Sequence, residues 1–255
     1  MDALRRILQH EDESLPLDEA ALLLARIQYP DLPLAPWLAE LDFHARQIRR
    51  LSLYGFRNAA HNYLFGELAF SGNGDDYYNP RNSCLNSVLE SRRGIPITLS
   101  IVYIELARRL GITVDGIPAP GHFLVRIEDD GDTYYIDVFN NGKIRDDIEG
   151  EVDPRFLVPA TKRMILIRML NNLRLIYLQR QAWHKAAAVL DLLLLADPVD
   201  ADALRQRAAA RAALHRYQAA CSDLSRYLTL RPLDPGKDEL KAQISNLRRM
   251  HAHKN

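Results

Sequence analysis

The chain has 255 residues, of which 47% are hydrophobic and 26% are charged, and its formal net charge is zero. These values are typical of a soluble globular protein with one large or two ordinary domains. The longest apolar runs, such as residues 189–196, are too short to span a bilayer, so we expect no membrane segment. Two cysteines are too few for a disulfide framework, which favours a reducing, cytoplasmic location.

Charge is distributed unevenly along the sequence. Residues 160–255 contain 17 Lys and Arg against 8 Asp and Glu, whereas residues 1–159 contain 16 against 25. The positive C-terminal part suits an acidic partner. It equally suits docking of the two halves on each other, and the sequence leaves both interpretations open. Few aromatic residues accompany the C-terminal arginines, so nucleic-acid binding is not favoured.

Residues 1–70 are predicted to be helical. Apolar residues recur with helical spacing over 18–27, 37–51 and 59–68, and Pro30 and Pro33 end the first of these segments. A loop of turn-forming residues follows at 71–76. We therefore expect the helical part to precede a core over 77–145.

This core is predicted to begin with two helices and to continue as a hairpin. The short helix covers 82–89, and the longer one runs from Pro96, where a missing N–H costs little, to Gly111. Two strands, at 121–127 and 133–139, are joined by an acidic turn over 128–132. The first domain, residues 1–159, is therefore predicted to be α+β.

The register of this hairpin decides whether two polar side chains meet. If Asp130 and Gly131 are the central turn residues, paired residue numbers sum to 261 and Asp137 faces Leu124. A sum of 259 would place Asp137 directly opposite His122. In both registers His122 and Asp137 share a face of the hairpin, whereas an even sum, which the sequence does not exclude, would separate them.

Residues 160–255 are predicted to be helical throughout and contain a 34-residue repeat. The pairs with this spacing are Leu170 and Leu204, Trp183 and Tyr217, Ala186 and Ala220, Leu190 and Leu224, Leu194 and Leu228, and Pro198 and Pro232. Small, large and proline positions in this order are typical of tetratricopeptide repeats. We predict repeats at 167–200 and 201–234, covered by a helix over 237–250. Because two repeats bury little surface, the array is expected to pack against the first domain.

The segment between Gly94 and Phe139 indicates a possible chemistry. A helix, His122 and Asp137 follow one another in the order of a cysteine–histidine–aspartate site, with the nucleophile at a helix N-terminus, then the base, then the orienting carboxylate. No cysteine stands at the start of this helix. The sequence therefore predicts a base and its orienting partner without the expected nucleophile.

These motifs resemble those of the bacterial SirB-type family, uncharacterised transglutaminase-like proteins with C-terminal tetratricopeptide repeats. The resemblance is carried by residues 77–83, 94–100, 120–126 and 136–137. It implies a transglutaminase-like (papain-like) α+β core without a demonstrated reaction. Counting back from Gly111 to the nucleophilic cysteine of catalytically active relatives leads to Pro96, while His122 and Asp137 match their base and orienting residue.

Three other side chains are candidates for a nucleophile. Cys84 lies on a short helix, where a cysteine is usually a small core residue. Thr98 and Ser100 lie in the first turns of the longer helix, where hydroxyls usually satisfy free N–H groups. Cys221, next to the packing alanine of the second repeat, is expected to be structural. The pair of His122 and Asp137 can form a functional pocket or a buried polar pair that stabilises the fold.

Cofactor and metal sites are not predicted, because the sequence has neither a phosphate-binding glycine loop nor Cys and His residues at metal-ligand spacing. We predict a non-catalytic scaffold or regulator that binds a protein or an acidic peptide. Arg205 and Arg211 are the candidate partner-binding residues. The alternative is a hydrolase or acyltransferase that uses Cys84, Thr98 or Ser100 with His122 and Asp137. The oligomeric state is not indicated.

Overall fold

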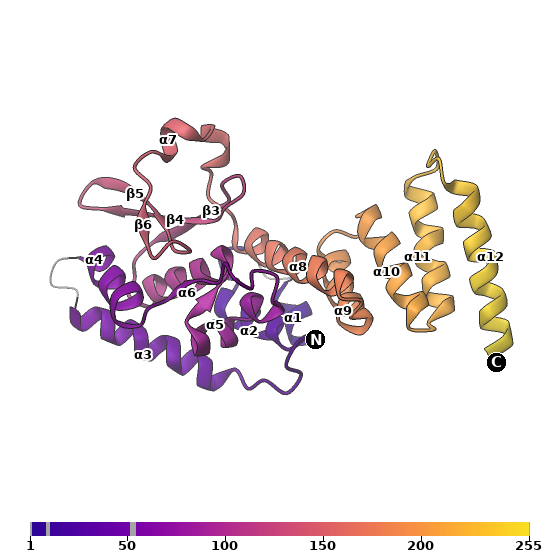
Figure 1. Ribbon diagram of the computed structural model, residues 1–255, viewed down its shortest axis with the longest axis horizontal. Helices are drawn as coiled ribbons and strands as arrows, with labels where there is room; N and C mark the ends of the chain where they lie inside the picture. The colour runs from indigo at the N-terminus through magenta and orange to yellow at the C-terminus, as the bar shows by residue number, and fades with distance from the viewer. Residues whose placement is uncertain (1, 9–10, 52–54, 255) are drawn as a thin grey trace. The chain divides into compact units, whose positions relative to one another are not determined.

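The computed structural model describes residues 2–8, 11–51 and 55–254 (Figure 1). It divides into two units, residues 1–169 and 170–255, and the division falls within helix α8, Lys162–Gln179. The first unit combines helices with a small sheet, and the second consists of helices. This arrangement confirms the predicted α+β domain followed by an all-α region.

Helices occupy the first part of unit 1, as predicted. After α1, Asp2–Ile7, come α2, Leu17–Ala25, and α3, Ala35–Leu51. The third predicted helix is α4, Phe56–His61, which continues as a π-helical segment over Asn62–Glu67. Almost every side chain of α2 is buried, whereas α3 buries a narrow stripe that includes Leu41 and Ile48. Helix α2 therefore lies inside this unit and α3 at its surface.

Two helices and a pair of very short strands follow. Helix α5 covers Leu85–Ser91 and α6 covers Pro96–Arg109; β1, Ser71–Gly72, pairs in parallel with β2, Arg93–Gly94. Proline stands in the first turn of α6, as expected. Gly111, just beyond the helix, has a φ of +75°, a conformation that favours glycine. Eleven residues of α6 are buried, so this helix is central to unit 1.

An antiparallel sheet of four strands packs against α6 (Figure 1), in the order β3-β4-β5-β6. The strands are β3, Val114–Ile117; β4, Leu124–Asp129; β5, Asp132–Asp137; and β6, Lys143–Ile144. The sequence predicted β4 and β5 but missed the two outer strands. A short helix, α7, Ile148–Glu151, follows, and a small apolar cluster joins Leu124 and Tyr135 to Ile148 and Leu157.

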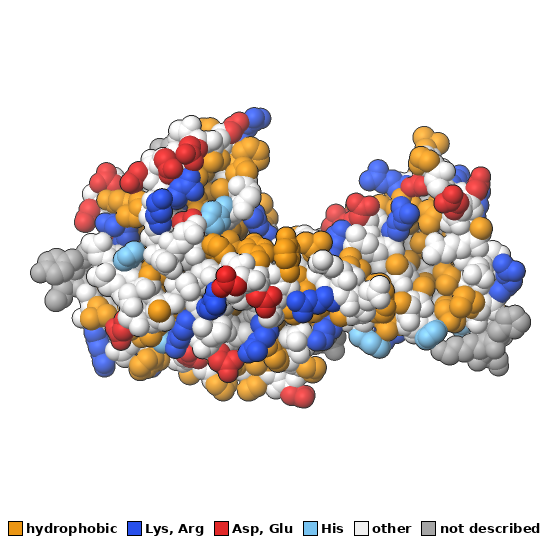
Figure 2. Space-filling model, viewed as in Figure 1, with side chains coloured by type: hydrophobic (Ala, Val, Ile, Leu, Met, Phe, Trp, Pro, Cys, Tyr) orange, Lys and Arg blue, Asp and Glu red, His pale blue; other side chains and the backbone are white. Residues whose placement is uncertain are grey.

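The β4–β5 turn has the predicted geometry. Asp130 and Gly131 both have positive φ, 53° and 89°, as a two-residue type I′ turn requires. Val125 pairs with Ile136, which is the register whose residue numbers sum to 261. The alternative sum of 259 is therefore wrong. Acidic side chains gather around this end of the sheet (Figure 2), in agreement with the acidic sequence of residues 128–132.

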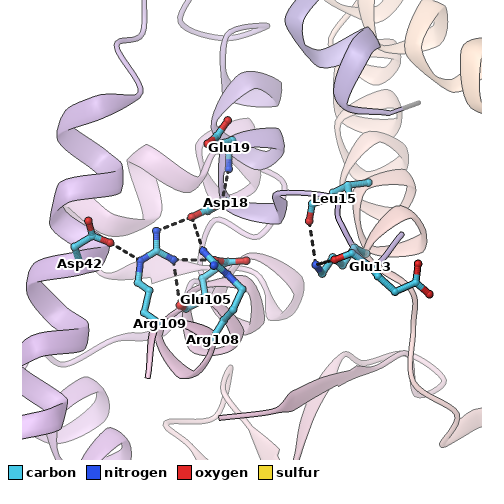
Figure 3. A network of polar contacts seen from close by, with 9 residues as sticks. Glu13, Leu15, Asp18, Glu19, Asp42, Glu105, Arg108 and Arg109 are labelled. Carbon is cyan, nitrogen blue, oxygen red and sulfur yellow. Dashed lines mark hydrogen bonds and ion pairs between the residues drawn. The ribbon is translucent and has the colours of Figure 1, made fainter. Parts of the chain in front are cut away.

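A network of charged groups joins α2, α3 and α6 (Figure 3). The guanidinium of Arg109 donates to Asp18, Asp42 and Glu105 at 2.5 to 2.8 Å. Burial alone would raise the pKa of Asp18, but hydrogen bonding and the positive charge of Arg109 hold it below its usual value. Burial and the nearby charge of Asp18 raise the pKa of Glu105. The network therefore joins three helices through two buried carboxylates with opposite pKa shifts.

Helix α8 begins in unit 1. The carboxylate of Asp12 accepts from the backbone N–H groups of Lys162 and Arg163 at 2.9 and 2.8 Å. An acidic side chain far away in sequence therefore satisfies the free N–H groups at the start of α8, which also suits the helix dipole.

Four further helices make up the remainder of unit 2: α9, Trp183–Ala196; α10, Ala201–Ala213; α11, Tyr217–Leu230; and α12, Lys237–Lys254. Helices α10, α11 and α12 lie side by side (Figure 1). The small residues of the repeat, Ala186 and Ala220, are fully buried, so neighbouring helices approach closely at these positions. None of the helices in the described ranges is long and apolar enough to cross a membrane.

Candidate functional site

His122 and Asp137 lie together where the two central strands of the sheet end, just before β4 begins and at the last residue of β5. His122 Nε2 and Asp137 Oδ2 are 2.7 Å apart. Asp137 is the last residue of β5, whereas His122 lies in a turn just before β4, where Gly121 has a φ of +71° and His122 N–H donates to the carbonyl of Ala119. The prediction that His122 lies within a strand was therefore wrong, because β4 begins at Leu124.

Asp137 is almost completely buried and is held by several donors. Besides His122, it accepts from the side chain of Asn140 at 2.7 Å and from the backbone N–H groups of Phe139 and Asn140 at 3.1 Å. Burial would raise the pKa of Asp137, but its hydrogen bonds to His122 and Asn140 hold the pKa below its usual value. The group is therefore an ionised carboxylate that fixes the orientation of the imidazole.

His122 remains accessible from solvent. Its side chain is 22% exposed, and its ring packs edge-on against Phe139, with 6.2 Å between ring centroids. Its backbone carbonyl accepts a hydrogen bond from Arg168 on α8 at 3.0 Å. An oriented imidazole at a surface can bind a ligand or move a proton.

Thr98 is engaged in the start of α6. Its hydroxyl is fully buried, donates to the carbonyl of Asn82 at 2.6 Å and accepts from the N–H of Ile95 at 3.3 Å. These bonds satisfy a free N–H at the helix N-terminus and join α6 to the segment before α5. The contacts of Thr98 are those of a structural residue.

Ser100 and Cys84 are also buried. Neither is exposed to solvent, and the Cys84 thiol donates to the carbonyl of Pro80 at 3.3 Å. Within the described ranges, the imidazole of His122 forms no hydrogen bond with Thr98, and the Ser100 hydroxyl has no hydrogen-bond partner. The structure therefore brings His122 and Asp137 together but does not bond either hydroxyl to them.

Other residues around this pair were not identified from the sequence. They are Asn140, which holds Asp137, and Tyr77, Phe139 and Arg168. Asn140 follows Asp137 closely, so its role could have been suspected from the turn that ends the hairpin. Arg168 gave no such signal, because it lies in the helical C-terminal sequence, 46 residues after His122.

The two arginines predicted to bind a partner differ in their surroundings. Arg211 donates to Asp191 and Asp223 at 2.9 and 2.8 Å, beside Arg207, which binds the same two carboxylates. Arg205 is exposed, with its guanidinium 5.9 Å from the ring centre of Tyr227. Arg211 is therefore part of an ion-pair cluster, whereas Arg205 is available at the surface.

Within residues 2–8, 11–51 and 55–254, no three or more His, Cys, Asp or Glu side chains are grouped in a way that could hold a metal ion.

Comparison with known families agrees with this architecture. The family model described as transglutaminase-like superfamily matches residues 35–171, and a tetratricopeptide repeat model matches residues 173–245. The protein is similar to a UPF0162 protein of Xylella fastidiosa, strain 9a5c, with 41% identity over 93% of this chain and 92% of that protein. It is also similar to UPF0162 protein YchA of Escherichia coli K12, with 25% identity over 74% of each sequence.

A shorter similarity reaches beyond bacteria. The human F-box only protein 21 is 42% identical over 88 residues, which make up 31% of this chain and 14% of that protein. No solved structure matches the sequence. The transglutaminase-like and tetratricopeptide parts implied by the resemblance are thus confirmed, and the chain belongs to the transglutaminase-like superfamily, among the UPF0162 proteins.

Proposed function

We propose that this protein is a non-catalytic member of the superfamily that binds a protein or peptide as a scaffold or regulator. The observation that carries the proposal is the absence of a nucleophile from the histidine–aspartate pair. The family resemblance places Pro96 at the position of the expected cysteine, and in the described structure the buried Thr98 hydroxyl bonds to Asn82 while the buried Ser100 hydroxyl has no hydrogen-bond partner. The buried Cys84 thiol donates to the carbonyl of Pro80. A cytoplasmic location and the narrower SirB-type assignment stay predictions.

The tetratricopeptide repeats support the binding part of this proposal. Such repeats present surfaces that hold helices or extended peptides, and they generally mediate protein–protein interactions. An acidic peptide is favoured by the excess of Lys and Arg in residues 160–255. Arg205 lies over Tyr227, which lines a hollow of about 460 Å³ together with Leu233 and Asp234.

The hollow has apolar and charged walls. Leu233, at the turn between α11 and α12, is 94% exposed, and apolar side chains project at this turn (Figure 2). A peptide that combines an apolar residue with an acidic one matches this combination. We therefore expect Arg205 to contribute to binding, whereas Arg211 acts within the repeat.

A peptide array followed by calorimetry tests the proposal. We expect the full-length protein to bind acidic peptides with an apolar residue, and Arg205→Glu to weaken binding about tenfold through charge repulsion. Arg249→Glu, on the exposed side of α12, makes the same change of net charge and is the matched control. Equal effects of the two variants, or no binding of any peptide, would contradict the proposal.

The alternative function is a hydrolase or acyltransferase. The observation in its favour is the base itself, since His122 is oriented by Asp137 at 2.7 Å and is accessible from solvent. Such an enzyme would have to move Cys84, Thr98 or Ser100 toward the imidazole. Covalent labelling distinguishes the two functions, because only an activated nucleophile depends on His122 for its reactivity.

A further inference from the structure

Arg168 lies next to the histidine–aspartate pair and has no acidic partner among the described residues. It lies in the part of α8 that belongs to unit 1 and is partly buried. Its guanidinium lies 5.3 Å from the ring centre of Phe123 and donates to the carbonyl of His122. Within the residues that the structure describes, no carboxylate forms an ion pair with Arg168.

Two other partly buried arginines of the protein are paired with acids. Arg109 is paired with Asp18, and Arg207 with Asp223, and the pKa of both arginines is raised despite their burial. For Arg168, burial lowers the pKa instead. A charge removed from water without an opposite charge is unfavourable, so its retention here points to a ligand that supplies the missing charge.

The nearest acid is not available to Arg168. The carboxylate of Asp137 already accepts four hydrogen bonds, from His122, Phe139 and twice from Asn140. Because both oxygens of Asp137 already accept hydrogen bonds, this carboxylate is bound to the imidazole and does not pair with the guanidinium of Arg168.

Aromatic side chains complete the surroundings of Arg168. The ring of Tyr77 packs edge-on against Phe139 at 6.1 Å between centroids, and Phe139 packs in the same way against His122. Burial raises the pKa of the Tyr77 phenol while the positive charge of Arg168 opposes this shift, which places the two groups near each other. The Tyr77 side chain is 39% exposed, and its hydroxyl donates to no described residue. We call Arg168, Tyr77, Phe139 and His122 the Arg168 patch.

From this arrangement we propose that the Arg168 patch binds a carboxylate group of the partner peptide. A single guanidinium offers one unit of charge and a planar pair of N–H donors, which match one carboxylate. The phenol of Tyr77 offers a further donor, and the rings of Phe139 and Tyr77 offer apolar contact beside it. The carboxylate comes from an acidic side chain or from the C-terminus of the peptide. This inference rests on the proposed peptide-binding function and assigns a chemistry to one of its contacts.

Paired peptides test the inference and separate the two sources of the carboxylate. The first pair is N-acetyl-Ala-Ala-Glu-Ala amide and the same peptide with Gln in place of Glu. The second pair is N-acetyl-Ala-Ala-Ala as the free acid and as the amide. Nuclear magnetic resonance titration of the full-length protein gives each dissociation constant and shows whether the signals of His122 and Tyr77 shift.

In one of the two pairs, we expect the peptide with the carboxylate to bind about tenfold more tightly than its neutral counterpart. Its binding should also shift the resonance signals of His122 and Tyr77. Arg168→Gln is expected to remove this difference, and Tyr77→Phe to reduce it. Arg155→Gln, at a side chain that is 85% exposed, is the control and should leave it unchanged.

Two results would overturn the inference: equal binding of acid and neutral peptides by the unmodified protein, or a preference for the acid that survives in Arg168→Gln. The first result needs no variant, so it remains decisive if Arg168→Gln fails to fold. If acidic array peptides bind and depend on Arg205, while the paired peptides show no preference that depends on Arg168, the proposed function stands and this inference fails. Absence of binding by every peptide would contradict both.

Discussion

Thr98 and Ser100 are both buried hydroxyl residues near the start of α6, but only one of them has hydrogen-bond partners. Thr98 donates to Asn82 and accepts from Ile95, whereas the Ser100 hydroxyl has no partner within the described structure. Thr98→Val should therefore lower the free energy of unfolding by about 1–3 kcal/mol, because it leaves buried backbone groups unsatisfied. Ser100→Ala should change it little.

Urea denaturation of the two variants checks this prediction. Thr98→Ser, which keeps the hydroxyl, should recover most of the stability lost in Thr98→Val. A loss in Ser100→Ala as large as that in Thr98→Val would contradict this prediction and show that the Ser100 hydroxyl makes a stabilising hydrogen bond.

At the scale of single residues, the sequence predicted the pair of His122 and Asp137 but not their surroundings. The tight hairpin turn fixes the register of β4 and β5, but His122 lies in a turn before β4, so its contact with Asp137 does not follow from strand pairing alone. Arg168 was not predictable, because its contact depends on how a helix from the C-terminal sequence packs on the sheet. The burial of Cys84, Thr98 and Ser100 was the expected structural interpretation, but the partners of the Cys84 thiol and the Thr98 hydroxyl needed coordinates.

Between elements, the network around Arg109 predicts how stability depends on pH. The pKa of Asp18 is depressed in the folded protein, so its contribution is present above the pKa of the unfolded state and is lost as the pH falls through the folded value. Asp18→Asn should lower the free energy of unfolding by about 3 kcal/mol at pH 7, because it breaks a buried ion pair. The difference from the unmodified protein should shrink as the pH falls toward 3.

Denaturation at a series of pH values measures this difference, and Glu105→Gln provides a contrast of opposite sign. Because the pKa of Glu105 is raised, its contribution is present below the unfolded pKa and is lost as the pH rises through the folded value. Asp153→Asn, in an exposed pair with Arg155, should follow the unmodified protein. A constant effect of Asp18→Asn at every pH would be inconsistent with this interpretation.

The ion-pair cluster of unit 2 gives a prediction for the repeats. Arg207 and Arg211 share Asp191 and Asp223, which lie on α9 and α11. Arg211→Glu would place a third carboxylate there and should destabilise unit 2 by about 3 kcal/mol or more. Arg205→Glu, at an exposed position, should cost less than about 1 kcal/mol.

Thermal and chemical unfolding followed by circular dichroism compare these two variants. If Arg211→Glu were as stable as Arg205→Glu, the cluster would contribute little, and Arg211 would again be a suitable residue for testing partner binding. The expected instability is the reason that binding should be tested with Arg205 instead.

The elements themselves were predictable to different degrees. Long segments with helical periodicity, such as α3 and α6, were found close to their observed ends. Strand β3 was missed because it is four residues long and contains Asp115 and Gly116, which are unusual in strands. The structure explains this glycine, since a Cβ at position 116 would lie 2.7 Å from the ring of Phe123.

For the whole molecule, the predicted fold rested on the 34-residue repeat and on the family resemblance. The 34-residue period predicted a helical repeat in the C-terminal sequence, where the structure has helices and α12 contacts α11. The proposed function depends on a smaller feature, the proline that the family resemblance places where a nucleophile is expected beside His122 and Asp137. The docking of the acidic half on the basic half stays a prediction.

Covalent labelling followed by mass spectrometry tests the proposed absence of catalysis most directly. The full-length protein and His122→Ala are incubated with a thiol-directed electrophile and with a fluorophosphonate, and Cys221→Ala controls for background reaction at the second cysteine. A non-catalytic protein should give no adduct that depends on His122, so both proteins should react equally slowly. A stoichiometric adduct on Cys84, Thr98 or Ser100 that disappears in His122→Ala would contradict the proposal and show that the protein is an enzyme.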